Sequence, residues 1–238
     1  MYSVYRHNEL IINTELWGES LETFFGSENE KYLGFGNLVQ LTRTSLKTSV
    51  DCAPMQLHKN MEIVDVILKG SIEFQDSVGQ TSSFPANTVQ VLSAGSGIYR
   101  WEFISSDDSA EKIQLGFLPD KLNQPVVKTK ASFNLQKYKN SFVELISPAY
   151  ASSLTIRQQA AVLLGEFDAD QHIGYSLNNT SVGIFVYVVR GKITVRNTIL
   201  SVGESVGITA EEQTILYTSE PSILLLVEVE LIEHLENS

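Results

Sequence analysis

Cysteine is nearly absent from this chain, and long apolar runs are missing altogether. Cys52 is the single cysteine among 238 residues, so no intramolecular disulfide forms and an oxidising compartment is not indicated. No run reaches the roughly 18 consecutive apolar residues that a membrane-spanning helix needs. The beginning of the chain lacks the charged region and apolar core of a secretory signal. We therefore expect a cytoplasmic protein that does not enter a membrane.

Positive charge is also scarce. The chain has 17 Lys and Arg against 28 Asp and Glu, which gives a formal net charge of −11. Non-specific binding to nucleic acid or to an anionic membrane depends on clustered positive charge. The composition therefore argues against direct nucleic-acid binding. It leaves room for a protein partner and for a small polar or anionic ligand in a locally basic pocket.

What the sequence does contain is strand patterns, and they occur twice. Short runs of β-branched and aromatic residues alternate with Gly, Asn, Asp and Ser, as is typical of antiparallel sheets. The run VDVILKGSIEFQD (64–76) aligns with VYVVRGKITVRN (186–197), which places Gly70 on Gly191. Two copies of one β-unit indicate a duplication, in which each copy forms a small antiparallel barrel or jelly roll.

Three segments of the first copy are more specific than this general pattern. They are YLGFGNLVQL (32–41), QLHKNMEIVDVILKGSIEFQDSVG (56–79) and VQVLSAGSGIYRWEF (89–103). Their sequence and spacing resemble the pirin family of the cupin superfamily. In the second half the resemblance continues mainly through YVVRGKITV.

The resemblance implies an all-β bicupin with two tandem antiparallel β-barrels of the jelly-roll type. We expect an N-terminal cupin domain with an N-terminal arm over residues 1–125, a linker over 126–150, and a C-terminal cupin domain over 151–238.

Metal-binding pirins hold an iron-like cation with two histidines one residue apart on one strand and a His-x-Glu pair on another. Residues i and i+2 on a strand share a face, so four ligands meet at one point. By resemblance these positions fall here on Gln56, His58, Arg100 and Glu102. Glutamine is a weak iron ligand, and a guanidinium has no lone pair to give and repels a dication. The metal site is therefore predicted to be degenerate, with no cofactor. Any iron-like metal that did bind would lie at His58 and Glu102.

The strand at 99–103 allows two interpretations. By its pattern alone, Tyr99 and Trp101 face a core while Arg100 and Glu102 face water. By the resemblance, Arg100 and Glu102 point into the barrel, where a buried carboxylate needs a positive partner. Arg100 would then supply the charge that the metal supplies in relatives, with Glu62 as a second candidate to pair with it.

These observations predict a pirin-like protein that acts in small-ligand binding, in regulation or in a protein interaction. The pocket would be lined by Gln56, His58, Arg100 and Glu102, with Glu62 beside it, and no residue is assigned a catalytic role. The alternative is a metal-dependent dioxygenase of the quercetin 2,3-dioxygenase type with an atypical ligand set.

Overall fold

The structure of the chain, a computed structural model, describes residues 1–15, 17–24, 33–47, 53–104, 109–147, 154–177 and 181–231. Cys52 lies outside these ranges. Nearly all regular structure within them is strand, joined by two short 3-10 helices, η1 (His7–Glu9) and η3 (Gln136–Tyr138). In this part of the chain no helix has both the length and the apolar character needed to cross a bilayer.

Four sheets form two domains, and the first domain contains two of them. Its seven-stranded sheet has the order β12 (Val127–Ser132), β9 (Thr88–Ser93), β6 (Glu62–Lys69), β11 (Ala110–Phe117), β4 (Leu38–Leu46), β3 (Gly18–Glu22), β2 (Ile11–Glu15). Its four-stranded sheet has the order β5 (Ala53–His58), β10 (Ile98–Ile104), β7 (Ser71–Asp76), β8 (Thr81–Pro85).

The second domain repeats this plan. Its six-stranded sheet has the order β1 (Tyr2–Tyr5), β19 (Ser205–Ile208), β16 (Val182–Arg190), β21 (Ser222–Glu230), β14 (Ala160–Phe167), β13 (Ser141–Ile146). Its four-stranded sheet has the order β15 (His172–Ser176), β20 (Gln213–Thr218), β17 (Lys192–Val195), β18 (Thr198–Ser201). The all-β prediction is thus confirmed. The closed barrels are not, because each domain is a jelly-roll-like pair of separate sheets.

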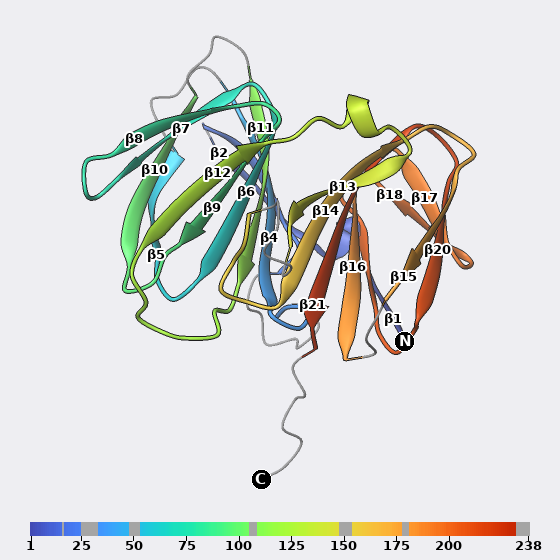
Figure 1. Ribbon diagram of the computed structural model, residues 1–238. Coiled ribbons are helices and arrows are strands. Elements are labelled where there is room, and N and C mark those ends of the chain that lie inside the picture. The colour runs from blue at the N-terminus through green and yellow to red at the C-terminus, as the bar shows by residue number, and fades with distance from the viewer. Residues whose placement is uncertain are drawn as a thin grey trace.

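The two large sheets face each other in the middle of the molecule, and the small sheets lie on the outside (Figure 1). The largest hydrophobic core therefore lies between the domains. It joins Val64 and Leu115 of the first domain to Phe185 and Leu225 of the second. This position explains why β6 and β16 read as nearly continuous apolar runs, because both faces of each strand are buried.

The two domains repeat each other at a glycine turn. Gly70 joins β6 to β7 with φ of +70°, and Gly191 joins β16 to β17 with φ of +82°. Glycine adopts this left-handed backbone without steric penalty. A Cβ at Gly70 would lie 2.7 Å from the Ser109 carbonyl oxygen, and one at Gly191 would lie 2.4 Å from that of Pro221. The alignment made from the sequence therefore marks equivalent hairpins.

The chain crosses between the domains more often than its sequence predicts. The N-terminal strand β1 pairs with β19 of the second domain, although residues 1–125 were expected to form one unit. The segment expected as a linker, 126–150, contains two strands: β12 extends the first domain beside β9, and β13 extends the second beside β14.

Candidate functional site

A cluster of polar side chains lies between the two sheets of the first domain, where a jelly roll ordinarily has apolar side chains. Asp65 comes from β6, Arg100 and Glu102 from β10, and Lys112 and Gln114 from β11. Residues two apart on a strand share a face, and Asp65 pairs directly with Gln114 across strands. The exposed fractions are only 0% for Asp65, 2% for Arg100 and Lys112, and 6% for Glu102. We call these five residues the polar core.

Within the polar core, two cations share the same oxygen atoms. The Arg100 guanidinium donates to Asp65 Oδ2 at 2.6 Å, to Gln114 Oε1 at 3.0 Å and to Glu102 Oε1 at 3.5 Å. The Lys112 ammonium donates to Glu102 Oε1 at 2.5 Å, to Gln114 Oε1 at 2.9 Å and to Asp65 Oδ1 at 3.3 Å. Arg100 also lies over the Phe74 ring, 4.3 Å from its centroid.

The formal charges of the polar core cancel. Two positive side chains face two carboxylates, so the interior holds ions but no net charge. Burial by itself raises the pKa of Asp65, yet the neighbouring Arg100 and Lys112 hold the pKa below its usual value. Both carboxylates are thus matched by cations at hydrogen-bond distance, and the positive charges leave no excess with which to attract an anion.

His58 lies at the edge of the polar core. Its exposed fraction is 5%. Burial, followed by the positive charge of Arg100, lowers its pKa to about 3, so the imidazole is neutral at physiological pH. Its Nε2 atom is buried and has no hydrogen-bond partner. His58 is therefore a neutral ring beside a charged network and not a member of it.

Gln56 and Glu62 are not members of the polar core. Gln56 is the cross-strand partner of Arg100, but its side chain is exposed to solvent. Glu62 is buried on the opposite face of β6 from Asp65, where Ser93 Oγ donates to it at 2.6 Å and the Arg157 backbone N–H at 3.2 Å. The expectation that Glu62 pairs with Arg100 is wrong, because side chains alternate between the two faces of a strand.

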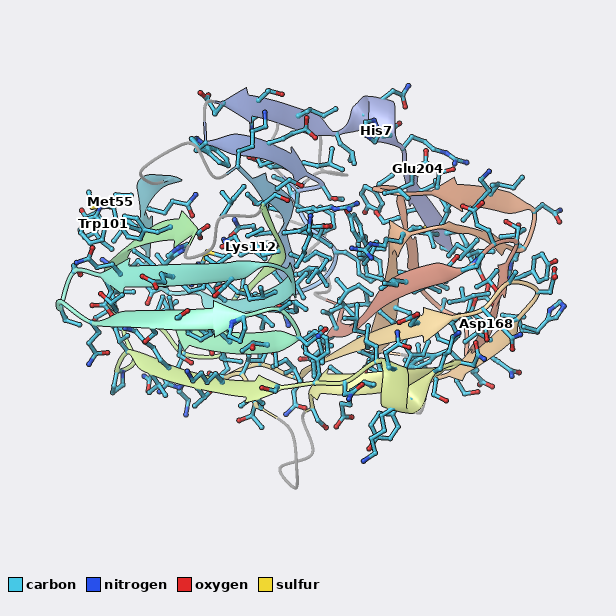
Figure 2. The ribbon with its side chains drawn as sticks, turned by 90° about the horizontal axis from the view of Figure 1, so that it is seen from above. His7, Met55, Trp101, Lys112, Asp168 and Glu204 are labelled. Atoms are coloured by element: carbon cyan, nitrogen blue, oxygen red, sulfur yellow. The ribbon has the colours of Figure 1, made fainter. Side chains whose placement is uncertain are left out.

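The outer face of β10 also differs from the simpler interpretation of its pattern. Tyr99 is 43% exposed and Trp101 is half-buried. Figure 2 places Trp101 beside Met55 at the outer margin of the domain, whereas Lys112 lies inside. Arg100 and Glu102 are thus the inward residues of this strand.

Three members of the polar core were missed in the sequence. Asp65 interrupts the apolar run EIVDVILK, and Lys112 and Gln114 interrupt AEKIQLGF. A charged residue within a strand that is buried on both faces needs a partner of opposite charge. These polar residues within otherwise apolar strands were the signal in the sequence that could have identified the three missed members.

The residues present do not fit a divalent metal ion. Of the four ligand positions implied by the resemblance, His58 and Glu102 keep donor atoms, but Glu102 Oε1 already accepts from Lys112 and Arg100. A dication at that oxygen would meet two fixed positive charges. Across the described ranges, no group of three or more His, Cys, Asp or Glu side chains is arranged to hold a metal.

The second domain shows what the same positions contain in an ordinary core. The equivalent positions follow from the alignment of Gly70 with Gly191 and from the strand registers of the two domains. Asp65 corresponds to Val186, Gln114 to Leu226, Lys112 to Leu224, Glu102 to Leu216 and Arg100 to Thr214. These counterparts are buried, and the four aliphatic ones belong to one hydrophobic cluster. The fold thus accepts an apolar interior at these positions.

A groove of about 740 Å³ lies between the domains. Val91 and Thr129 line it from the large sheet of the first domain, and residues 154–159 line it from the second. Arg157 and Lys121 bring positive charge to its walls, and Asp120 brings negative charge. Glu62 does not line the groove but accepts hydrogen bonds from two residues that do, Ser93 through Oγ and Arg157 through its backbone N–H.

Comparison with known proteins agrees with this architecture. The Pirin family model matches residues 12–116, and the model of the quercetinase C-terminal cupin domain matches residues 145–229. A Zymomonas mobilis protein, ZMO1337, provisionally named a quercetin 2,3-dioxygenase, is 30% identical over 175 residues, which cover 73% of this chain and 74% of that protein. The chain belongs to the pirin family. The resemblance first seen in the strand motifs is thereby confirmed.

Two other relatives are less similar in sequence. Quercetin 2,3-dioxygenase of Escherichia coli K12 is 25% identical over 174 residues, which cover 72% of this chain and 74% of that protein. A pirin-like protein of Caulobacter vibrioides is 28% identical over 177 residues, which cover 74% and 76% of the two chains.

Solved structures share the fold at lower identity. The Escherichia coli pirin YhhW in complex with nickel(II) superposes with a TM-score of 0.87 at 22% identity, covering 98% of this chain and 100% of YhhW. Quercetin 2,3-dioxygenase from Acinetobacter baumannii superposes with a TM-score of 0.81 at 16% identity, covering 97% and 86%.

Proposed function

We propose that this pirin-family chain is a binding protein, with a small-ligand or regulatory role, that uses neither a bound metal nor oxygen chemistry. One observation carries the proposal: the place where a metal ligand set would meet is filled by Arg100 and Lys112, both paired with carboxylates. A metal would have to displace an ammonium and a guanidinium that are already paired with carboxylates, and the site is buried away from water.

The interdomain groove supports the binding part of the proposal. The polar core is almost fully covered, whereas exposed residues such as Val127 line the groove. Its walls offer charges of both signs and hydroxyl groups, which suit a small polar molecule with more than one functional group. We therefore place the ligand there, and not among Arg100, His58 and Glu102 as the sequence suggested.

The proposal is tested on the purified chain in two steps. Elemental analysis and calorimetric titration with Ni²⁺ should show no stoichiometric metal, and an oxygen electrode should record no uptake with quercetin and added Fe²⁺. Thermal-shift screening of small carboxylates, amino acids and sugar phosphates should then give a ligand. Its binding should be lost in Val127→Trp and kept in Val78→Trp, since Val78 is 70% exposed and does not line the groove. Stoichiometric metal or oxygen uptake would refute the proposal.

The second candidate function is metal-dependent quercetin dioxygenation. It is favoured by the description of the Escherichia coli relative as quercetin 2,3-dioxygenase. It requires a metal at His58 and Glu102, where the arrangement of charges opposes one. The oxygen-uptake measurement separates the two functions directly.

A further inference from the structure

Lys112 is held in the way that proteins hold a small cation. Its Nζ atom contacts one oxygen from each of three side chains, namely Asp65, Glu102 and Gln114. These side chains come from β6, β10 and β11. An ammonium has three N–H donors, so every donor of Lys112 is used.

Arg100 is less completely bound. Its Nε atom is buried and has no partner, and one face of its guanidinium is covered by Phe74. Arg100 contacts the same three side chains, but one of its nitrogen donors has no partner, whereas every donor of Lys112 is used. The other unpartnered nitrogen nearby, Nε2 of His58, belongs to a neutral ring that has the capacity to act as a ligand.

We infer that Lys112 is the residue that closes this domain to divalent metals, and that the lack of histidine at positions 56 and 100, the ligand positions implied by the family resemblance, is not sufficient to explain the closure. The inference rests on the proposed metal-free function. A metal bound to Glu102 Oε1 would lie within contact range of the Lys112 ammonium, which is 2.5 Å from the same oxygen. That repulsion persists whatever residue stands at position 100.

The net charge of the site also indicates that Lys112 must be replaced before a dication can bind tightly. Replacing Gln56 and Arg100 by histidine leaves Asp65, Glu102 and Lys112, with a net charge of −1. Replacing Lys112 as well leaves −2, which one dication neutralises. Leucine is the suitable replacement, because Leu224 occupies the corresponding position in the second domain.

The experiment measures Ni²⁺ affinity by calorimetry in three proteins: the wild type, Gln56→His/Arg100→His, and the same pair with Lys112→Leu. The triple variant should bind one Ni²⁺ about 10- to 100-fold more tightly than the pair, the size of effect that groups around metal ligands have. Added Ni²⁺ should also raise its melting temperature. The matched control adds Lys137→Leu to the pair, since Lys137 is exposed in η3, and should bind no more tightly than the pair.

The outcomes separate the two proposals. Equal Ni²⁺ affinity in the pair and in the triple variant, or a folded triple variant that does not bind, would overturn the role of Lys112. Stoichiometric binding by the wild type would overturn the proposed function instead. If the triple variant does not fold, Lys112→Met replaces Lys112→Leu, keeps the length of the side chain, and is judged by the same criteria.

Discussion

Arg100 and Lys112 depend on each other because they donate to the same three side chains. Asp65 Oδ1, Glu102 Oε1 and Gln114 Oε1 each accept from both cations. Removing either cation leaves buried carboxylates with one positive charge between them. Effects of substitutions in such a network are not additive.

His58 should make the stability of the protein depend on pH. Its folded pKa of about 3 lies below the usual value of 6.5, because burial and then Arg100 oppose the charged form. Between these two values the unfolded chain binds a proton that the folded chain does not, so stability falls as the pH drops from about 6.5 towards 3. His58→Gln should flatten that slope in urea unfolding measured across this range.

The control for this prediction is His172→Gln. His172 is exposed at the start of β15, where its ring lies 5.0 Å from that of Tyr217. This substitution should leave the slope unchanged. Asp65 and the cations Arg100 and Lys112 remain in both variants. An equal slope in the wild type and in His58→Gln would contradict the buried, neutral state of the ring.

The part of the candidate site that was predictable came from local spacing. Arg100 and Glu102 share a face because they are two residues apart, and the family resemblance indicated which face is inward. Their partners Asp65 and Lys112 lie on other strands, 35 residues before Arg100 and 10 residues after Glu102, and the apolar residues of those strands occupy both faces. Alternation carries no information about orientation in such strands, so partners could not be assigned before the pairing of β6 with β11 was known.

At the level of elements, the two domains differ in their interiors. The first domain has charged and polar side chains between its two sheets, and the second domain has mostly aliphatic side chains at the equivalent positions. The equivalent positions of β16, β20 and β21 are mostly aliphatic, with Val186, Leu216 and Leu224 among them. Buried ion pairs are weak evidence for stability, because desolvating the charges offsets their attraction. The polar core is therefore weak evidence for a stabilising role, which agrees with the proposal that it excludes divalent metals.

A set of substitutions that copies the second domain tests this view. Arg100→Thr alone should lower the free energy of unfolding by about 3–5 kcal/mol, because it leaves an uncompensated buried carboxylate. The full set, namely Asp65→Val, Arg100→Thr, Glu102→Leu, Lys112→Leu and Gln114→Leu, should recover that loss or exceed the wild type by about 1–4 kcal/mol. Urea unfolding measures both.

The matched control is Arg6→Thr. Arg6 pairs with Glu204 in a partly exposed ion pair at 3.1 Å, which should be worth about 1 kcal/mol or less. If Arg100→Thr proves as mild as Arg6→Thr, the polar core is not the tightly coupled network described here.

The elements that the sequence predicted well are those defined by local signals. The hairpins at Gly70 and Gly191 are marked by a glycine between two strand runs. The partners of β1, β12 and β13 were not predictable in this way. Their patterns indicate strands, but an edge strand can join either of two neighbouring sheets, and only the packing of the two domains determines which.

At the scale of the whole molecule, the two domains share one core and should unfold together. Phe185 of β16 is fully buried, and its ring lies 5.5 Å from that of Tyr5, 5.3 Å from that of Phe24 and 5.6 Å from that of Phe35. Phe24 and Phe35 both lie between β3 and β4 of the first domain, so a second-domain ring packs against a first-domain segment. Loss of this ring should weaken both domains.

Phe185→Ala should therefore lower the free energy of unfolding by about 3–5 kcal/mol, as large-to-small core substitutions do. Both tryptophans, Trp17 and Trp101, lie in the first domain, so tryptophan fluorescence reports that domain while far-UV circular dichroism reports both. The two midpoints in urea should fall together. Ile199→Ala, at a residue 57% exposed on β18, should move neither. A fluorescence midpoint that stays at its wild-type value while the dichroism midpoint falls would mean that the domains unfold independently, and that the core between them does not couple their stabilities.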